Sequence, residues 1–380
     1  MPEPRSIVIL SSGRTIASTR RLEEVLTERG HSVAVLQPED LQIVVDGEVP
    51  ALLHRGRAVD LPDAVIPRIP TSKSVLGAAI VTQFEQMGVY CLNSTRALES
   101  SRNKLRALQK LSRHGIALPK TMFLSARGRG LDGVIEQIGG APVIIKLVEG
   151  TQGVGVMLAE TEEGALAILE TLRKTGHDVL LQAFVAESRG RDVRMLVVGG
   201  KVLAAVRRVA SGKEFRSNVH RGAQAEAYPI EPAYADTARR AAQILGLSVA
   251  GVDMLEGADG PVIMEVNSSP AIAGMEEATG LDLATPIAEL IERRLHHPPL
   301  DVVQRLTMSP DHGVCEVHLN TASELVGQTL AETNLRELGL QVLQVRRGPE
   351  LVSSPRGRFQ LEADDILVMY GSLEAAKHLD

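Results

Sequence analysis

Hydrophobic and polar residues along the first hundred positions form a repeating pattern of strands and helices. The apolar run SIVIL (6–10) predicts a buried strand, STRRLEEVLTERG (18–30) has helical spacing that ends at Gly30, and HSVAVLQ (31–37) predicts a second strand. DAVIPRI (63–69) repeats the strand pattern after a break. Because strands alternate with helices, we expect a small doubly wound α/β domain over residues 1–97.

The pattern continues through the middle of the chain and changes near residue 296. SSRNKLRALQKLSRHG (100–115) predicts one amphipathic helix that stops near Gly115, and a mixed α/β body follows to residue 295. HHPPLDVVQRLTMSPDHG (296–313) combines several prolines with little periodicity, which predicts a linker over 296–311. The later apolar runs VCEVHL, LQVLQVRRG and FQLEADDILVMYG predict the strands of a separate small α+β domain over 312–380.

A glycine-rich loop separates two apolar runs of the middle domain, PVIIKL and GVMLAE. Its glycines, Gly150, Gly153 and Gly155, lack the Gly-Lys-Ser/Thr ending of a Walker loop and do not lead into a helix as a dinucleotide-binding loop does. We therefore expect a β-hairpin at about 143–160 whose tip forms a flap, where glycines let backbone N–H groups approach phosphate oxygens. A plain hairpin turn also explains the glycines, but Lys146 favours the flap because its charge can lie against a phosphate.

Two carboxylates and an amide stand on neighbouring apolar strands. Asp253 lies in VAGVDML, and Glu265 and Asn267 lie two residues apart in PVIMEVN, so these two share one face of a strand. Three oxygen ligands beside a phosphate flap suit octahedral Mg²⁺. The alternative is a buried acid held by hydrogen bonds on an edge strand, and that arrangement needs partners for its charge.

Composition narrows the function further. Asp and Glu outnumber Lys and Arg by 47 to 41 and there is no Trp, so the chain has neither the positive footprint nor the stacking residues of a nucleic-acid-binding protein. Cys91 and Cys315 lie far apart and outside metal-ligand spacing, which fits a reducing compartment. No apolar run has the length of a signal-peptide core or a membrane span, so we expect a cytoplasmic protein without membrane contact.

Several motifs together resemble a known family. LVEGTQGVGV, RDVRMLVVGGKVLAAVRR, EFRSNVHRG, VAGVDML and VIMEVNSSPAIAGMEEATG, in this order, resemble the ATP-grasp fold and its RimK-type branch, the ribosomal protein glutamate ligases. The resemblance spans about residues 5–295. It implies a pre-ATP-grasp domain over 1–97, an ATP-grasp domain over 98–295 and an ATP-dependent carbon–nitrogen ligase that joins an acid to an amino acid, as a peptide synthase does.

The resemblance also implies a role for each matching residue. ATP contacts fall to Lys104, Lys146, Gly150, Gly153, Gly155, the hinge residues Gln182, Ala183 and Phe184, and Asp192, Arg216, Ser217 and Asn218. Arg208 and Arg216 are the implied catalytic residues, and Asp253, Glu265 and Asn267 the implied ligands of two Mg²⁺ ions, for which Mn²⁺ can substitute. His220 and Arg221 are expected to orient a substrate carboxylate, although a solvated loop histidine is the plainer reading of His220.

Two departures from the family pattern affect these assignments. The hinge reads Gln182-Ala183-Phe184 where the family usually has Gln-Glu-Tyr, so a side-chain hydrogen bond from that Glu to adenine is absent. Arg207-Arg208-Val209 stands where the family tends toward Glu-Arg-Arg. Arg208 aligns with the catalytic arginine.

The expected reaction makes an amide from a carboxylate. A carboxylate oxygen is a poor leaving group, so we expect ATP to convert the acceptor carboxylate to an acylphosphate, which the amine of L-glutamate then attacks. The resemblance implies the carboxyl-terminal glutamate of a small-subunit ribosomal protein, or a growing oligoglutamate chain, as the acceptor. Relatives that extend another carrier or a cofactor tail, and a nucleotide-sensing regulatory protein without turnover, remain alternatives.

The tail resembles a second family. SELVGQTLAETNL, VRRG and LEADDILVMYG resemble the carboxyl-terminal regulatory domain of potassium-transport regulators, known as the TrkA-C or RCK-C domain. Such domains pair with themselves and bind small ligands between subunits. We expect it to make this chain a homo-oligomer, with an effector site as the alternative because Arg346, Arg347, Arg356 and Arg358 suit an anionic ligand.

Overall fold

The structure is a computed structural model, and it describes residues 3–46, 49–128, 130–148, 155–210, 223–296, 311–348, 350–377 and 379. The chain divides into two compact units, Met1–Pro298 and Pro299–Asp380. Most of the expected linker, residues 297–310, lies outside the described residues. No helix in the described ranges is long and apolar enough to cross a bilayer.

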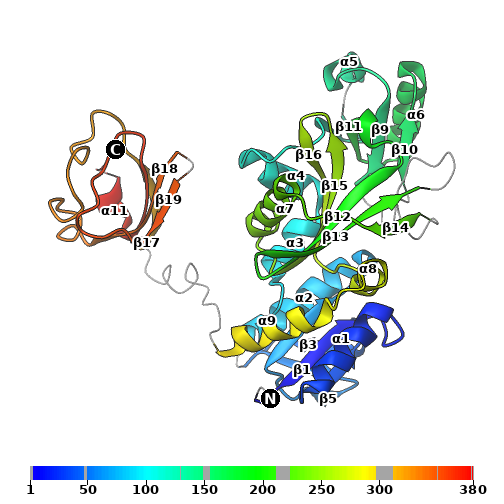
Figure 1. The fold of residues 1–380 in the computed structure, drawn as a ribbon, viewed down its shortest axis with the longest axis horizontal. Coiled ribbons are helices and arrows are strands. Elements are labelled where there is room, and N and C mark those ends of the chain that lie inside the picture. The colour runs from blue at the N-terminus through cyan, green and yellow to red at the C-terminus, as the bar shows by residue number, and fades with distance from the viewer. Residues whose placement is uncertain are drawn as a thin grey trace. The chain divides into compact units, whose positions relative to one another are not determined.

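A parallel sheet of four strands forms the amino-terminal part of the first unit, in the order β2-β1-β6-β7 (Figure 1). Its strands are β1 (Ser6–Ser11), β2 (Ser32–Leu36), β6 (Ala64–Arg68) and β7 (Tyr90–Cys91), and its helices are α1 (Ala17–Glu28) and α2 (Ser74–Gln86). This confirms the predicted α/β pattern. The chain winds from β1 to β2 on one side and then crosses to β6 on the other, so the carboxyl ends of β1 and β6 lie side by side, with Ser11 opposite Arg68.

A small antiparallel sheet interrupts this pattern and was not predicted. It consists of β3 (Leu41–Val44), β4 (Ala51–His54) and β5 (Arg57–Ala58). Buried Leu41 and Leu52 join it to the core beside α2.

The single helix expected over 100–115 is two helices, so that prediction was wrong. α3 (Thr95–Arg102) ends at Asn103, and α4 (Lys104–Arg113) begins directly after it. Asn103 has extended backbone angles, and its side chain accepts a hydrogen bond from the Arg106 backbone N–H. An asparagine cap of this kind starts a new helix even though the amphipathic spacing continues across it.

The glycine-rich loop joins two antiparallel strands, as predicted. β9 (Val143–Leu147) pairs with β10 (Val156–Ala159), with Lys146 opposite Val156, in a sheet of order β10-β9-β11-β8. The other strands are β8 (Thr121–Leu124) and β11 (Val179–Ala183), and the helices α5 (Val134–Ile138) and α6 (Glu162–Lys174) complete this part. Residues 149–154, including Gly150 and Gly153, lie outside the described residues.

An antiparallel sheet of five strands carries most of the remaining candidate residues, in the order β14-β13-β12-β15-β16. Its strands are β12 (Arg191–Val198), β13 (Lys201–Val209), β14 (Gln224–Ala227), β15 (Val249–Gly257) and β16 (Gly260–Asn267). The buried alanines and Leu245 of α7 (Pro232–Leu245) pack on this sheet. The helices α8 (Ile272–Thr279) and α9 (Ala284–His296) share a second core with α1, β1 and the other face of this sheet, where Leu196 and Val206 are buried.

An ion pair ties the first and last helices of this unit together. Arg29, after α1, donates two hydrogen bonds of 2.6 and 2.7 Å to Glu292 of α9, and His31 Nε2 lies 3.0 Å from the same carboxylate. The hydrogen bond from Arg29 lowers the pKa of Glu292 despite the opposing effect of burial. The parallel sheet is thereby fixed to the part that holds the five-stranded sheet.

The second unit is an antiparallel sheet of order β17-β20-β18-β19. It comprises β17 (His312–His318), β18 (Leu340–Arg347), β19 (Glu350–Ser353), β20 (Ile366–Ser372) and the short helix α11 (Leu373–Ala376). The strand expected over FQLEADDILVMYG begins only at Ile366. Before it, buried Asp365 accepts two hydrogen bonds of 2.8 Å from Arg347, which holds those residues in a turn.

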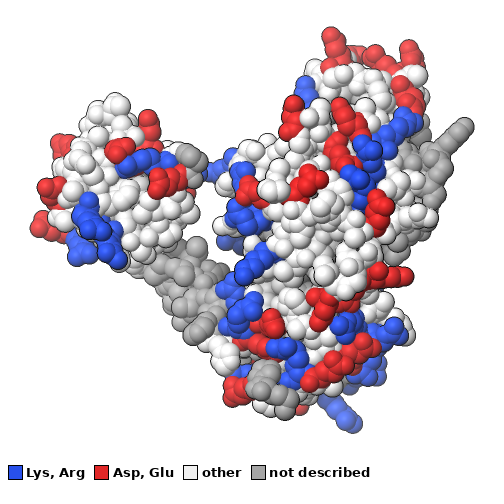
Figure 2. Space-filling model, viewed as in Figure 1, with Lys and Arg blue, Asp and Glu red and all other residues white. Residues whose placement is uncertain are grey.

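Charges of both signs are intermixed on the visible face of each unit (Figure 2). This distribution agrees with the composition and gives that face no extended positive surface for nucleic acid.

Candidate active site

Four charged side chains on three adjacent strands form the centre of the candidate site, and all of them except the partly exposed Arg194 are buried. On β12, Asp192 faces Arg208 of β13, and Arg194 faces Asp253 of β15. Arg208 donates two bonds of 2.6 Å to Asp192 and one of 2.9 Å to Asp253, while Arg194 donates bonds of 2.5 and 2.6 Å to Asp253. Bidentate hydrogen bonds between arginine and a carboxylate are among the strongest in proteins, and they fix the orientation of both side chains.

The charges compensate one another. Burial lowers the pKa of Arg208, but the negative charges of Asp253 and Asp192 outweigh it and raise that pKa. Burial raises the pKa of Asp253, but Arg194 and Arg208 outweigh it, so the carboxyl stays ionised. Asp253 and Asp192 are 0% and 1% exposed, so neither could stay charged without these arginines.

Glu265 and Asn267 complete the predicted oxygen cluster. Glu265 lies directly across from Asp253 in the β15–β16 pair, and Asn267 Nδ2 donates to Glu265 Oε1 at 3.1 Å and to Asp253 Oδ2 at 3.4 Å. Burial and the nearby charge of Asp253 raise the pKa of Glu265. The prediction that Glu265 and Asn267 share a strand face is confirmed.

Two of the three predicted metal ligands are available to a divalent cation in this structure. Glu265 carries the carboxylate whose charge is least compensated, and the amide oxygen of Asn267 is a second hard donor. Asp253 lies beside them, but both its oxygens accept bonds from arginine, so it would ligate a metal only by exchanging one of them. Within the described ranges, no group of three or more His, Cys, Asp or Glu side chains could hold an ion by itself.

Two lysines lie on the flap side of Glu265. Burial lowers the pKa of Lys146 on β9 to about 8, against the opposing charge of Glu265. Burial also lowers the pKa of Lys104, whose Nζ donates to the carbonyls of Leu147 and Val148 at 3.3 Å each. Lys104 therefore links the start of α4 to the end of the flap strand, and the two ammonium groups suit an anion held at this place.

The hinge residues use their polar groups within the protein. Gln182 is buried and its Nε2 donates to Thr121 Oγ1 at 2.9 Å, and the N–H of Ala183 donates to the Lys120 carbonyl at 2.9 Å. The Arg189 guanidinium lies 5.7 Å from the centre of the Phe184 ring. A contact from this hinge to a purine would therefore come from other backbone groups, and these assignments stay predictions.

The remaining predicted residues divide into two groups. Gly155 has φ of 75°, and a Cβ there would lie 2.8 Å from Leu147 Cδ1, so glycine is required to begin β10. Arg216, Ser217, Asn218, His220 and Arg221 lie outside the described residues.

Arg194 is the functional candidate that sequence reasoning missed. It lies two residues after Asp192 in RDVR, so the strand period already places the two on one face. The period does not say which side chain lies opposite on the next strand, and that partner, Asp253, is what gives Arg194 its place in the site.

Three family models match this chain. A RimK-like ATP-grasp domain matches residues 101–291, a RimK PreATP-grasp domain residues 6–98 and a TrkA-C domain residues 314–380.

Curated relatives match at high identity. A protein of Rhodopirellula baltica named probable alpha-L-glutamate ligase is 50% identical over 372 residues, which cover 98% of this chain and 91% of the relative. A protein of Aeromonas salmonicida with the same name is 47% identical over 286 residues, which cover 75% of this chain and 96% of the relative. The second relative thus has no counterpart to about a quarter of this chain.

Solved structures share the fold. The ATP-grasp ligase PsnB, complexed with a minimal precursor, aligns with a TM-score of 0.60 at 23% identity, covering 76% of this chain and 99% of PsnB. D-alanine–D-alanine ligase from Bacillus anthracis, complexed with ATP, aligns with a TM-score of 0.57 at 15% identity, covering 78% and 98%. At these identities the likeness concerns the fold.

Replacing Lys146 with Ala should weaken Mg-ATP binding by roughly 10- to 100-fold, because one charge-assisted contact to a phosphate is lost. Calorimetric titration of the nucleotide measures the change. Lys120→Ala, at an exposed lysine of the same unit, is the matched control and should bind normally. Equal affinity in the two variants would remove Lys146 from the phosphate site.

The pKa of Lys146, about 8, predicts a pH dependence of that affinity. Above this pH the free protein has lost the proton, whereas bound phosphates favour the charged form, so binding must take up a proton. The dissociation constant should therefore rise between pH 8 and pH 9.5, by up to about tenfold per unit. In Lys146→Arg the charge persists throughout, and the rise should disappear. A rise of the same size in that variant would assign the dependence to another group.

Proposed function

The chain belongs to the RimK-like ATP-grasp ligases and is an ATP-dependent ligase, and from this premise we propose that it adds L-glutamate to a carboxylate through an acylphosphate. The observation that carries the proposal is the cluster of Glu265 and Asn267 beside buried Asp253, with the half-buried Lys104 and Lys146 close enough to feel the charge of Glu265. Such a place suits a triphosphate and a divalent metal together. The 50% identity to a probable alpha-L-glutamate ligase over nearly the whole chain supports glutamate as the amine.

The proposed reaction has two steps. An oxygen of the acceptor carboxylate attacks the γ-phosphorus of ATP, and the bond from that phosphorus to the β-phosphate oxygen breaks, which releases ADP. The amine of glutamate then attacks the acyl carbon, the carbon–oxygen bond to phosphate breaks, and the nitrogen loses a proton. Since no covalent enzyme intermediate is needed, the protein has to position the reactants and stabilise charge.

Named side chains of this chain suit those tasks. Lys104 and Lys146 would hold phosphate oxygens, and Glu265 and Asn267, with Asp253, would hold the metal, which we propose to be Mg²⁺ as two ions, with Mn²⁺ able to replace it. A bound divalent cation neutralises the phosphate oxygens. Arg208 uses Nε and Nη2 in its ion pairs, and its Nη1 has no protein hydrogen-bond partner within the described ranges, so it can face the developing oxyanion.

The acceptor follows from the family rather than from the geometry. We propose the carboxyl-terminal glutamate of a small-subunit ribosomal protein, or an oligoglutamate chain, with another carrier or a cofactor tail as the second candidate. The free thiols of Cys91 and Cys315 agree with activity in the cytoplasm.

Turnover of Mg-ATP with each amino acid tests the proposal, with and without carboxyl acceptors, followed by the mass of the product. Release of ADP that requires L-glutamate, with mass added in glutamyl steps, is the expected outcome. ADP release with a different amino acid would replace glutamate as the substrate. Tight ATP binding with no turnover in any mixture would favour the nucleotide-sensing alternative.

Glu265→Gln should abolish ligation in that assay while the protein remains folded, because it removes a metal-binding charge that forms no ion pair with an arginine of the described residues. Asp253→Asn is a poorer test, since it would also leave Arg194 and Arg208 buried with less compensation, a change that costs about 3–5 kcal/mol. Exposed Glu163 of α6 is the matched control as Glu163→Gln. Full turnover of Glu265→Gln at saturating Mg²⁺ would refute the metal assignment.

We also propose that the carboxyl-terminal unit pairs copies of the chain. Arg347 is occupied by Asp365 and Glu362, which leaves the exposed Arg346, Arg356 and Arg358 for any anionic effector. On the edge strand β19, Leu351 is 57% exposed, and an exposed edge strand with an apolar side chain is suited to pairing.

Deleting residues 312–380 should leave ligation measurable but lower the oligomeric state, since the Aeromonas relative lacks a counterpart to about a quarter of this chain. Light scattering gives the mass, and glutamate-dependent ADP release gives the activity. In the full chain, Leu351→Asp should also lower the mass, while Leu281→Asp, at a leucine 48% exposed in the first unit, should not. An unchanged mass in both the deletion and Leu351→Asp would refute pairing through this unit.

A further inference from the structure

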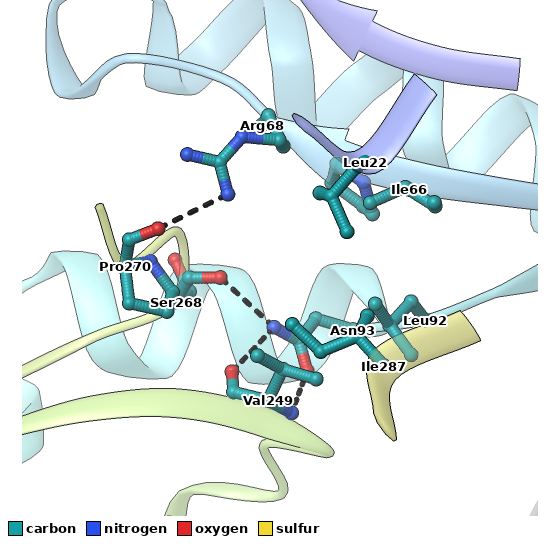
Figure 3. A pocket seen from close by; sticks show the side chains of 10 residues that line it. Leu22, Ile66, Arg68, Leu92, Asn93, Val249, Ser268, Pro270 and Ile287 are labelled. Carbon is teal, nitrogen blue, oxygen red and sulfur yellow. Dashed lines mark hydrogen bonds between the residues drawn. The ribbon is translucent and has the colours of Figure 1, made fainter. Parts of the chain in front are cut away.

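Arg68, at the end of β6, has an enclosed guanidinium with no acidic partner among the described residues. Arg68 Nη1 donates to the Pro270 carbonyl at 3.1 Å, and its Nε is buried without a hydrogen-bond partner. Burial lowers the pKa of this guanidinium to about 10. Figure 3 shows the group extending from β6 toward Pro270, at a hollow whose other walls include Leu22, Ile66, Leu92 and Ile287. A buried cation without a counter-ion is costly and calls for an anion.

A second arginine adds to the same excess of positive charge. Arg102, at the end of α3, donates to the Ile69 carbonyl at 2.5 Å, to Ser74 Oγ at 3.3 Å and to Ser268 Oγ at 3.5 Å, and all three are neutral. Burial lowers its pKa to about 10 as well. Neither arginine forms an ion pair with any residue in the described ranges, in contrast to Arg194 and Arg208 of the five-stranded sheet.

Some polar groups near Arg68 already have hydrogen-bond partners within the protein, and others do not. Asn93 donates to the carbonyls of Val249 and Ser268 at 2.9 Å and accepts from two backbone N–H groups, so it has nothing left for a ligand. Ser12, one residue beyond the Ser11 that faces Arg68 across the sheet, has a buried hydroxyl with no partner. Ser12 Oγ and Arg68 Nε are thus both without a hydrogen-bond partner in the described residues, and they lie near the carboxyl ends of two adjacent strands.

That place has the position of a ligand site in an open α/β sheet. In the order β2-β1-β6-β7 the winding direction reverses between β1 and β6, and ligands of such sheets bind outside the carboxyl ends of the strands at that reversal. Ser12 and Arg68 stand at those carboxyl ends, and α1 begins just beyond, at Ala17.

We propose that Arg68 and Ser12 bind a carboxylate of the incoming amino acid, with Arg102 adding positive charge nearby. The inference rests on the proposed ligation of an amino acid and names where that substrate is held. Either the α-carboxylate or the side-chain carboxylate supplies the required chemistry, a planar anion that accepts a forked pair of hydrogen bonds.

Space and distance favour the amino acid over a polypeptide acceptor. The hollow beside Arg68 has a volume of about 20 Å³, which is room for about one water molecule, so it admits one oxygen of a small anion and is too small for a polypeptide. Pro270 follows Asn267 by three residues, so the two Cα atoms lie at most about 11 Å apart. An amino acid anchored at Arg68 could thus direct its amine toward the metal and phosphate side chains.

Steady-state kinetics of Arg68→Gln tests the assignment. The KM for the amino acid that the wild-type protein uses should rise roughly 10- to 100-fold, while the KM values for ATP and the acceptor stay within about twofold. Arg68→Lys should recover part of the loss because it keeps the charge without the fork. Arg57→Gln, at an exposed arginine of the same domain, is the matched control and should match the wild type.

Ser12→Ala tests the same site independently, in case Arg68→Gln impairs folding. Its hydroxyl has no hydrogen-bond partner in the part of the chain that the structure describes, so thermal unfolding should be unchanged while the same KM rises roughly twofold to tenfold. Comparing glutamate with glutamine in Arg68→Gln identifies the carboxylate, since the preference for glutamate collapses only if the side-chain carboxylate binds there.

Three results would overturn the inference: a rise in the acceptor KM alone, unchanged kinetics in both Arg68→Gln and Ser12→Ala, or a loss of stability in Arg68→Gln with unchanged kinetics in Ser12→Ala. The test remains separate from that of the proposed function. If the wild type uses an amino acid other than glutamate, the proposed substrate fails, but the Arg68 variants still report whether a carboxylate of the amino acid actually used binds here.

Discussion

The buried ion pairs of Arg208 and Arg194 with Asp192 and Asp253 are the constraint on which the rest of the site depends. They join β13, β12 and β15, so each strand's register is fixed by charge as well as by backbone hydrogen bonds. Because the two arginines neutralise Asp253, Glu265 is left as the carboxylate with the least compensation, and its raised pKa follows from that neighbour and from burial. A divalent cation bound together with the nucleotide would supply the positive charge that Glu265 lacks in the protein alone.

The same ion pairs show which features of the site could be predicted from the sequence and which could not. The strand period placed Glu265 and Asn267 on one face, and the apolar runs with their glycine loop placed Lys146 on a hairpin, because both inferences need only local spacing. The pairing of Arg194 with Asp253 spans 59 positions and depends on which strands become neighbours, so no local pattern contains it. The break at Asn103 was visible as a capping residue, but the continuing amphipathic spacing argued for one helix, and the cap prevailed.

In the carboxyl-terminal unit, residues that look alike in the sequence have different roles in the structure. Its four arginines look alike in sequence, yet Arg347 is held by Asp365, by Glu362 and over the Phe359 ring at 5.2 Å, which makes it part of the fold. Charge composition alone therefore overstates how many cations a ligand could reach. Burial of the acidic partner, Asp365 at 0% exposure, is the property that separates a structural arginine from an available one.

The same criterion, applied to the first unit, distinguishes two pairs of arginines that are buried or partly buried. Arg194 and Arg208 have acids as partners and hold the strands, whereas among the described residues Arg68 and Arg102 contact only carbonyls and hydroxyls. Asn93 links the two regions, because it bonds the backbone where β15 begins and where β16 has just ended, and so fixes Ser268 and Pro270 relative to Asp253 and Glu265. The metal-facing side chains and the carbonyl that Arg68 holds thus belong to one stretch of chain, Glu265 to Pro270. A carboxylate held at Arg68 would therefore be positioned by the same stretch of chain that positions the metal-facing side chains, so the amino acid and the nucleotide would be aligned together.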